Sequence, residues 1–281
     1  MVKILSIFCV KILTVALVVV LALLMMDISS NLVWATIEST VESPTESVSA
    51  KAKAKDKKAE QNDRVKAIFT LGKSTSTLEE NRITLEELLE KDENKFCREA
   101  SAISLGNLGD KKAMPKLKQA LKDKSGNVRM RAVWALAKLG DKSGKQIALE
   151  TIKGQDVTAQ LLSVDALDAI GDKDVIPELK KNLESKNVWT RIHSKLTIKR
   201  LEIQGLSEQE KLNFLKETLK DEQFEVNQWA AKELAKIGTP EAITILNETA
   251  KDTKIAGSYS AKKILMRLEQ EQKKQVQEQG K

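Results

Sequence analysis

Aromatic residues and prolines are scarce in this chain. Phe, Trp and Tyr make up 4% of its 281 residues, and proline occurs only 4 times. Ala, Leu, Lys and Glu, which are abundant, favour helices. The composition therefore predicts helix over sheet, in a chain long enough for one or two domains with a large core.

Cysteine and histidine are also rare. Cys9 lies in the N-terminal segment and Cys97 stands alone in the rest of the chain, so no internal disulfide is expected there. The only histidine is His193. The sequence has no paired-cysteine metal spacing, no glycine-rich phosphate loop and no nucleophile elbow. We therefore predict a protein without enzymatic activity, with no catalytic residue, metal site or cofactor.

Residues 1–35 differ from the rest. Lys3 and Lys11 flank an apolar start, an uncharged run covers 12–26, and the small Ala35 ends the segment. These features are typical of a secretory signal peptide. An uncleaved anchor is the alternative, although the uncharged run is shorter than the about 20 residues of a comfortable membrane span. In either case we predict export to the periplasm or cell envelope of a bacterium.

Charge beyond that segment is only mildly biased. Without residues 1–35, 45 of the 47 basic and 39 of the 40 acidic side chains remain, a net charge of +6. Such a balance permits attraction to anionic surfaces but does not call for nucleic acid. Residues 36–60 and 271–281 are polar with almost no bulky apolar side chains, so we predict a disordered tether that turns helical near its end, and a polar tail.

A repeat fills the chain between these segments, over 61–270. Pairs of apolar residues three apart return at steps of 31, 31, 31, 36 and 31 residues. Such a pair lies on one face of a helix. The pairs are Leu105/Leu108, Leu136/Leu139, Leu167/Ile170, Ile198/Leu201, Leu234/Ile237 and Leu265/Leu268, with Ile68/Leu71 leading the series.

A second apolar series keeps the same step further along each unit, from Leu117/Leu121 to Leu246/Ala250. Each unit is therefore a first helix, a turn and a second helix. Glycine followed by Asp or Thr marks the turn, as in Gly140-Asp141 and Gly238-Thr239, because glycine ends one helix and the polar residue caps the next. Stacked helix pairs of this length predict an all-α solenoid, with about six pairs and a closing helix.

The segments VRMRAVWALAKLGD (128–141) and AIGDKDVIPELKKNL (169–183) resemble HEAT-type repeats of the short class, also seen in phycobilisome lyase subunits. The resemblance covers about residues 63–268. It implies a polar ladder between repeats, built from an early Arg and a turn Asp. Gln160 and Asn227 depart from the Arg position, and Thr239 departs from the Asp position. The matching residues are Arg98, Arg129, Arg191, Asp110, Asp141 and Asp172.

The same resemblance raises two enzymatic alternatives. An iron-dependent hydroxylase of this family needs several His-Glu pairs, and a single His193 cannot build such a site. A lyase-type subunit would use Cys97 as its reactive thiol. Residues equivalent to Cys97 in other repeats are small or apolar, so a buried helix residue is the simpler interpretation. We expect His193 to be an ordinary, partly exposed residue.

Two sets of residues are candidate partner contacts. Lysines recur on one face of the second helices, and they predict either a contact stripe for an acidic protein, glycan or lipid headgroup, or a solvated surface. Tryptophans stand at positions that hold Asp165, Glu225 or Ser260 in other repeats, so they are expected to be partly exposed. The residues are Lys118, Lys122, Lys153, Lys180, Lys216, Lys220, Lys251, Trp134, Trp189 and Trp229.

The sequence thus predicts an exported, monomeric scaffold that binds a protein partner through the surface of a solenoid. Nucleic acid is not an expected partner. A membrane is expected to be involved only through an uncleaved N-terminus. Two alternatives stay open: the lyase-type subunit with Cys97, and a membrane-surface protein that binds anionic lipid or glycan through the lysines.

Overall fold

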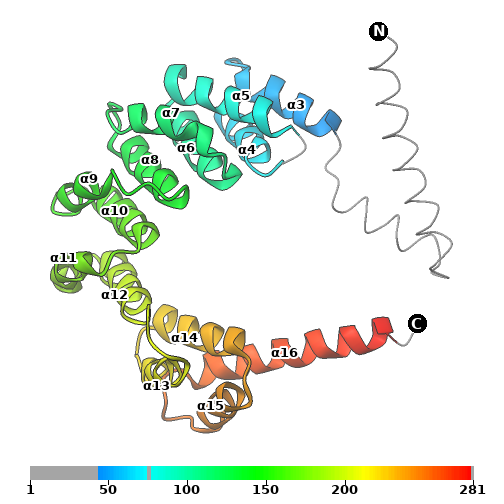
Figure 1. Ribbon diagram of the computed structural model, residues 1–281, viewed down its shortest axis with the longest axis vertical. Helices are drawn as coiled ribbons and strands as arrows, with labels where there is room; N and C mark the ends of the chain where they lie inside the picture. Colours follow the sequence, from blue (N-terminus) through cyan, green and yellow to red (C-terminus); the bar gives the residue numbers. More distant parts are fainter. Residues whose placement is uncertain (1–43, 75–76, 280–281) are drawn as a thin grey trace, which may run out of the picture. The chain divides into compact units, whose positions relative to one another are not determined.

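The computed structural model describes residues 44–74 and 77–279, and helices form its framework (Figure 1). No strand occurs in these two ranges. The predicted signal peptide at 1–35 and the start of the predicted tether lie outside them. The helices are α3 (Pro44–Lys55), α4 (Gln61–Leu71), α5 (Leu78–Lys91), α6 (Lys95–Leu108), α7 (Met114–Ala120), α8 (Gly126–Lys138), α9 (Lys145–Thr151), α10 (Val157–Ile170), α11 (Ile176–Lys181), α12 (Val188–Glu202), α13 (Glu208–Thr218), α14 (Phe224–Ile237), α15 (Pro240–Lys251) and α16 (Ser258–Gln279).

From α4 onward the helices alternate between two roles. The even-numbered helices, here called helices A, each pack against the next helix A along the chain. The odd-numbered helices α5 to α15, here called helices B, return the chain between them (Figure 1). The described residues thus contain six A–B pairs closed by α16, which confirms the predicted all-α solenoid.

The repeated leucines form the shared core of the stack. Leu105, Leu136, Leu167, Leu201 and Leu234 are all fully buried on successive helices A. Burial of a leucine side chain stabilises the folded state by about 1.5–3 kcal/mol, so each repeat gains stability mainly from its neighbours. A small residue recurs at the same steps on helices A and is fully buried in each, namely Ser101, Ala132, Ser163, Ser194, Ala230 and Ala261.

The turns after helices A follow the predicted glycine rule. Gly109 ends α6 with φ 75° and Gly171 ends α10 with φ 71°, both in the left-handed region. Thr239 then caps α15, with its side chain accepting from the Ala242 amide. The turn between α12 and α13 contains the extra residues that make one repeat step 36 instead of 31. In this turn Ser207 and Glu210 form a capping box at the start of α13. This box replaces the missing Gly-Asp signal.

The residue at the Arg position of each repeat ties helix A to the loop before it. Arg98, Arg129 and Arg191 each donate to the backbone carbonyl six residues earlier. Gln160 and Asn227, the two departures from Arg, donate to the carbonyl at the same relative position. Shorter amide side chains therefore keep the loop contact of the arginines.

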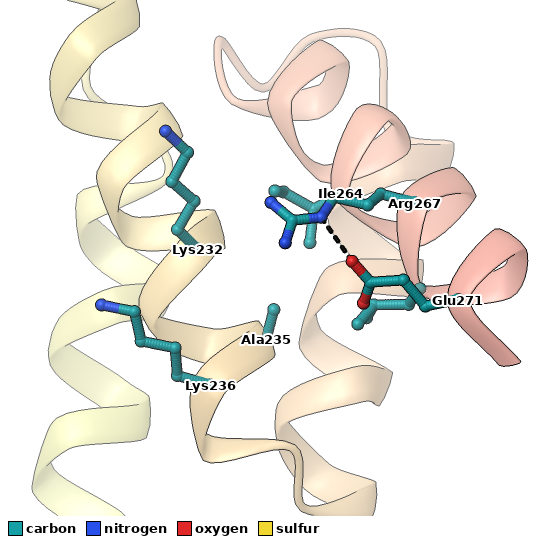
Figure 2. Close-up of a pocket in the computed structure, with 7 residues that line it drawn as sticks. Lys232, Ala235, Lys236, Ile264, Arg267 and Glu271 are labelled. Atoms are coloured by element: carbon teal, nitrogen blue, oxygen red, sulfur yellow. Dashed lines mark hydrogen bonds and ion pairs between the residues drawn. The ribbon is translucent and has the colours of Figure 1, made fainter. Parts of the chain in front are cut away.

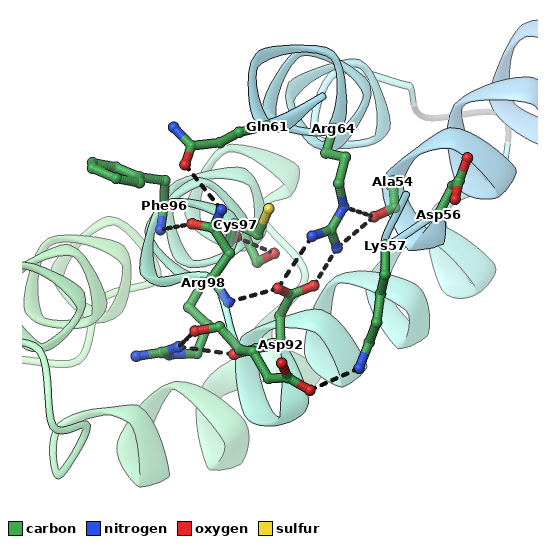
Figure 3. Close-up of polar contacts among 12 residues, drawn as sticks. Ala54, Asp56, Lys57, Gln61, Arg64, Asp92, Phe96, Cys97 and Arg98 are labelled. Carbon is green, nitrogen blue, oxygen red and sulfur yellow. Dashed lines mark hydrogen bonds and ion pairs between the residues drawn. The ribbon is translucent and has the colours of Figure 1, made fainter. Parts of the chain in front are cut away.

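The implied partnership between these arginines and the turn aspartates is wrong. Arg98 pairs with Asp123, at 2.8 Å, in the loop before the next helix A. One repeat earlier, Arg64 pairs in the same way with Asp92 and also donates to the Ala54 carbonyl (Figure 3). The ion pairs of Arg64 and Arg98 thus link helix A to the following B–A loop, whereas Arg129 and Arg191 bond only to the preceding loop among the described residues.

The turn aspartates join a second set of contacts at the opposite ends of helices A. Asp110 pairs with Arg82 at 3.0 Å, and Asp141 pairs with Lys118 at 2.7 Å. Asp172 pairs with Lys142 and Lys145. The Lys118 hydrogen bond, together with that from Ser143, lowers the pKa of Asp141 to about 2. The Arg and Asp positions therefore form two separate ladders.

The structure corrects the predicted tether over part of its length. Residues 44–55 form α3, whose Ala54 is fully buried, and the compact unit begins at Ala50 and not at residue 61. Two carbonyl contacts from Arg64 hold this helix. The polar tail continues α16 as a helix to Gln279, with exposed side chains over 271–278. None of the helices in the described ranges is long and apolar enough to cross a membrane.

Candidate protein-binding surfaces

All seven predicted contact lysines are exposed on or just after helices B. Acidic side chains stand among them. Lys118 pairs with Asp141 at 2.7 Å, Lys220 with Glu217 at 2.7 Å, and Lys216 lies 3.7 Å from Glu248. Three of the seven lysines therefore have acidic neighbours, and such a mixture of charges is typical of a solvated surface.

The three predicted tryptophans lie in different surroundings. Trp134 is partly buried where two core clusters meet, with the Lys138 ammonium 5.7 Å from its ring. Trp229 is also partly buried and packs on the C-terminal cluster. Trp189, at the start of α12, is 52% exposed. It is the one of the three that offers most of its surface to a partner.

Trp189 belongs to a row of exposed apolar residues at the N-terminal ends of helices A, here called the apolar edge. Val157, Val188 and Phe224 are the first residues of α10, α12 and α14, and they are 40%, 46% and 44% exposed. Tyr259, near the start of α16, is 62% exposed, and its ring centroid lies 6.2 Å from that of Phe224. Four successive repeats thus leave large apolar side chains in water at equivalent helix ends, and those of Phe224 and Tyr259 lie side by side.

A surface hollow of about 260 Å³ lies between α14 and α16 (Figure 2). Its apolar lining comes from Ala235, Ile264 and Leu268. Lys232 and Lys236 line it from α14, and Arg267 lines it from α16 beside Glu271. The hollow therefore combines a small apolar floor with a basic rim.

A second hollow, of about 450 Å³, lies on the other side of the same α14 residues. Lys232 and Lys236 line it again, together with Glu233 and Trp229 of α14, Arg200 of α12, and Ile203 directly after α12. The two hollows form one surface across α12, α14 and α16, here called the basic groove. The lysines of α14 stand in its middle.

The sequence carried an unused signal for this groove. Arg200, Lys236 and Arg267 occupy equivalent positions, each directly before the second residue of the apolar pair, at the steps of 36 and 31. Lys138 holds the same position on α8. The predicted contact lysines lie on or just after helices B, where Lys122 lines a separate hollow beside α7, but the basic side chains of this groove come from helices A.

A charged cluster connects α10 and α12 next to the groove. His193 lies 3.4 Å from Asp165, and Arg200 donates to Asp168 at 2.6 Å. The Asp165 hydrogen bond raises the pKa of His193, whereas burial raises the pKa of Asp168. His193 is partly exposed, as predicted. The described residues contain no group of His, Cys, Asp or Glu able to hold a metal ion.

Cys97 is fully buried in the first core cluster. Burial raises the pKa of its thiol, and the nearby Asp92 charge adds to this effect. Since the thiolate is the reactive form, these surroundings disfavour nucleophilic chemistry. The simpler of the two predicted interpretations, a buried helix residue, is confirmed.

Comparisons with known proteins agree with this architecture. Among solved structures, the phycocyanin lyase complex of CpcE and CpcF from Nostoc sp. PCC7120 is similar, with a TM-score of 0.52 and 21% identity over 81% of this chain and 89% of that one. Human deoxyhypusine hydroxylase gives a TM-score of 0.38 and 17% identity over 80% and 96%. An archaeal HEAT-like repeats protein from Thermococcus onnurineus NA1 gives 0.36 and 13% over 79% and 97%.

No curated protein sequence matched. The family model for HEAT repeats, however, matches residues 53–126, 81–160, 114–196 and 195–256 in overlapping copies. These matches cover most of the chain and coincide with the stacked helix pairs from α4 to α15. The chain therefore belongs to the HEAT-repeat family.

Proposed function

We propose that this HEAT-repeat chain is an exported, non-enzymatic scaffold that binds a protein partner. The main support for partner binding is the exposure of the apolar edge. Exposed apolar side chains that gather on a protein surface often mark an interaction site, and the rings of Phe224 and Tyr259 lie together on this edge. Aromatic side chains are also enriched where partners bind most tightly, and this edge presents Trp189, Phe224 and Tyr259 together.

The absence of activity is part of this proposal. Burial of Cys97 speaks against the lyase-type alternative, because a substrate would have to reach a thiol inside the first core cluster. The alternating charge on helices B speaks against the lipid-binding alternative, because Glu217 and Glu248 would repel anionic headgroups from the lysine face.

Site-specific photo-cross-linking in intact cells tests the edge. A photoreactive amino acid replaces Trp189 or Tyr259, and the matched control carries it at the exposed Lys153 near the end of α9. We expect a discrete cross-linked protein adduct from positions 189 and 259 and none from 153. Adducts with lipid, or adducts of the same yield at all three positions, would contradict a protein-binding edge.

Export is proposed from residues 1–35, since an apolar run between a basic start and a small residue directs a chain to the secretion machinery. Fractionation of the same cells tests it. We expect the chain in the envelope or periplasmic fraction, with a mass that shows whether residues 1–35 are still attached. Recovery in the cytosolic fraction would refute export while leaving partner binding to be decided by the cross-links.

A further inference from the structure

We infer that the basic groove across α12, α14 and α16 binds an acidic segment of a protein, with one or two apolar side chains of that segment seated in its hollows. This inference rests on the proposed protein-binding function and assigns it a second contact surface. The hollow between α14 and α16 has the size of a side chain, the basic side chains around it are weakly paired, and acidic neighbours offset most of the positive charge of the groove.

The size of the hollow between α14 and α16 favours a side chain over a small-molecule ligand. Pockets that enclose small ligands usually measure about 300–1,000 Å³ and bury most of the ligand. The hollow between α14 and α16 measures about 260 Å³ and lies open at the surface. Its floor of Ala235, Ile264 and Leu268 offers apolar contact without polar groups at its base. Such a hollow suits a single Leu, Ile or Phe side chain.

The basic side chains around this floor are weakly held. Lys236 pairs with Glu233 and Arg267 pairs with Glu271, in both cases within one turn of the same helix. Surface pairs of this kind contribute about 0.3–0.5 kcal/mol. Lys232 bonds only to the Gln228 amide oxygen, at 3.2 Å, among the described residues. All three can turn toward the carboxylates of a partner at little cost.

The charge of the groove suits a few carboxylates better than a polyanion. Arg200, Lys232, Lys236 and Arg267 supply four positive charges. Glu233, Glu271 and the Asp168 carboxylate that pairs with Arg200 offset most of them. Nucleic acid and sulfated glycan bind through many uncompensated cations, whereas an acidic peptide adds apolar contact to a small number of ion pairs.

Selection from a random peptide library on the full chain tests the inference. We expect the recovered peptides to be enriched in Asp or Glu near a Leu, Ile or Phe. The variant K232E/K236E should bind the same peptides roughly tenfold more weakly, because two attractive pairs become repulsive. Peptides selected on the K232E/K236E variant should instead be enriched in Lys and Arg. Both replaced side chains are exposed, so the thermal midpoint should stay unchanged.

The matched control is K153E/K251E. It makes the same change of charge at two exposed lysines near the ends of helices B, and neither lysine has a carboxylate partner in the described ranges. This control should keep the affinity of the unaltered chain. Equal weakening in both double variants would mean that only the overall charge matters, which would overturn the groove as a site.

Heparin oligosaccharide and vesicles containing phosphatidylglycerol serve as competing probes. Binding of either that is lost in K232E/K236E, with no acidic enrichment among the peptides, would assign the groove to glycan or lipid and overturn the inference. A selection that recovers no peptide would also overturn it. The cross-linking experiment tests only the apolar edge. If acidic peptides bind in the groove but positions 189 and 259 give no cross-linked protein, the apolar edge is refuted as a binding site and the groove is not.

Discussion

At the scale of single residues, the ladder arginines differ in what they hold. Arg98 is 3% exposed and joins the Asp123 carboxylate to two loop carbonyls, those of Asp92 and Glu93. Arg129, at the same position one repeat later, meets only loop carbonyls in the described residues. Replacing each of the two arginines therefore distinguishes the stability that a buried ion pair contributes from the stability that a loop hydrogen bond contributes.

Replacement of Arg98 by alanine should destabilise the protein by about 3 kcal/mol, because the partly buried Asp123 carboxylate loses its partner. Arg129→Ala should cost about 1 kcal/mol, the value of ordinary hydrogen bonds. Urea denaturation followed by circular dichroism measures both. Equal losses in the two variants would show that the ion pair adds nothing to the loop contact.

The effect of Arg98→Ala should also depend on pH. Burial alone would raise the pKa of Asp123, but hydrogen bonds from Arg98 and from the Ser125 amide outweigh it and lower that pKa. A lowered carboxylate pKa stabilises the fold above the unfolded-state value and is lost as the pH falls. The difference between the unaltered chain and Arg98→Ala should therefore shrink below about pH 4.

At the scale of helices and turns, the left-handed glycines can be tested without packing effects. Gly109 has φ 75°, and a Cβ placed there would meet no atom within 4 Å. Gly109→Ala should therefore cost about 1 kcal/mol through backbone strain alone. Gly126, inside the first turn of α8, has ordinary helical geometry, and Gly126→Ala should be neutral or stabilise by up to about 1 kcal/mol. Thermal unfolding of the pair gives the comparison, and a loss of stability in Gly126→Ala would contradict it.

Helices were predictable from the sequence wherever large apolar residues recur at the repeat spacing. Leu105 and Leu136 made α6 and α8 predictable, because each of these leucines is buried against a neighbouring repeat. The packing of α3 on the core was not predicted, because its buried residues, Ala50 and Ala54, are too small to stand out in a polar segment. Hydrogen bonds from Arg64 of the following helix and ion pairs from Lys51 and Lys55 to α5 also hold α3, and such long-range contacts are invisible in the local pattern.

The candidate surfaces were predictable only in part. Trp189 was singled out by comparing equivalent positions, and the structure leaves it exposed as expected. Its neighbours in the apolar edge were missed because Val188 and Phe224 look like core residues in a helical pattern. They are exposed because the first residue of a helix A lies beyond the face that the next repeat covers.

At the scale of the whole repeat array, the core is not continuous. Buried apolar residues form three clusters, and the second ends with Ile198 and Leu201 of α12, whereas the third begins with Leu212 of α13. The same place carries the step of 36 residues in the sequence. Polar side chains replace apolar ones among the buried residues of α12, namely Thr190, Ser194 and Thr197.

Because each repeat is stabilised by its neighbours, a polar junction is the weakest point of a solenoid. We therefore expect unfolding in two steps, with the block from α13 to α16 losing amide hydrogen-exchange protection separately from α4 to α12. A single transition with uniform protection would show that the junction between α12 and α14 is as strong as the others.

Ser194 offers a way to strengthen this junction. Its hydroxyl is buried and has no hydrogen-bond partner among the described residues, and alanine stands at the equivalent positions Ala132 and Ala230. Ser194→Ala should therefore stabilise the protein by about 1 kcal/mol and bring the two unfolding steps closer together. Ser163, which donates to the Ala159 carbonyl at 2.7 Å, is the matched control, and Ser163→Ala should give no gain. If the two variants behave alike in urea denaturation, the unpaired hydroxyl is not what weakens the junction.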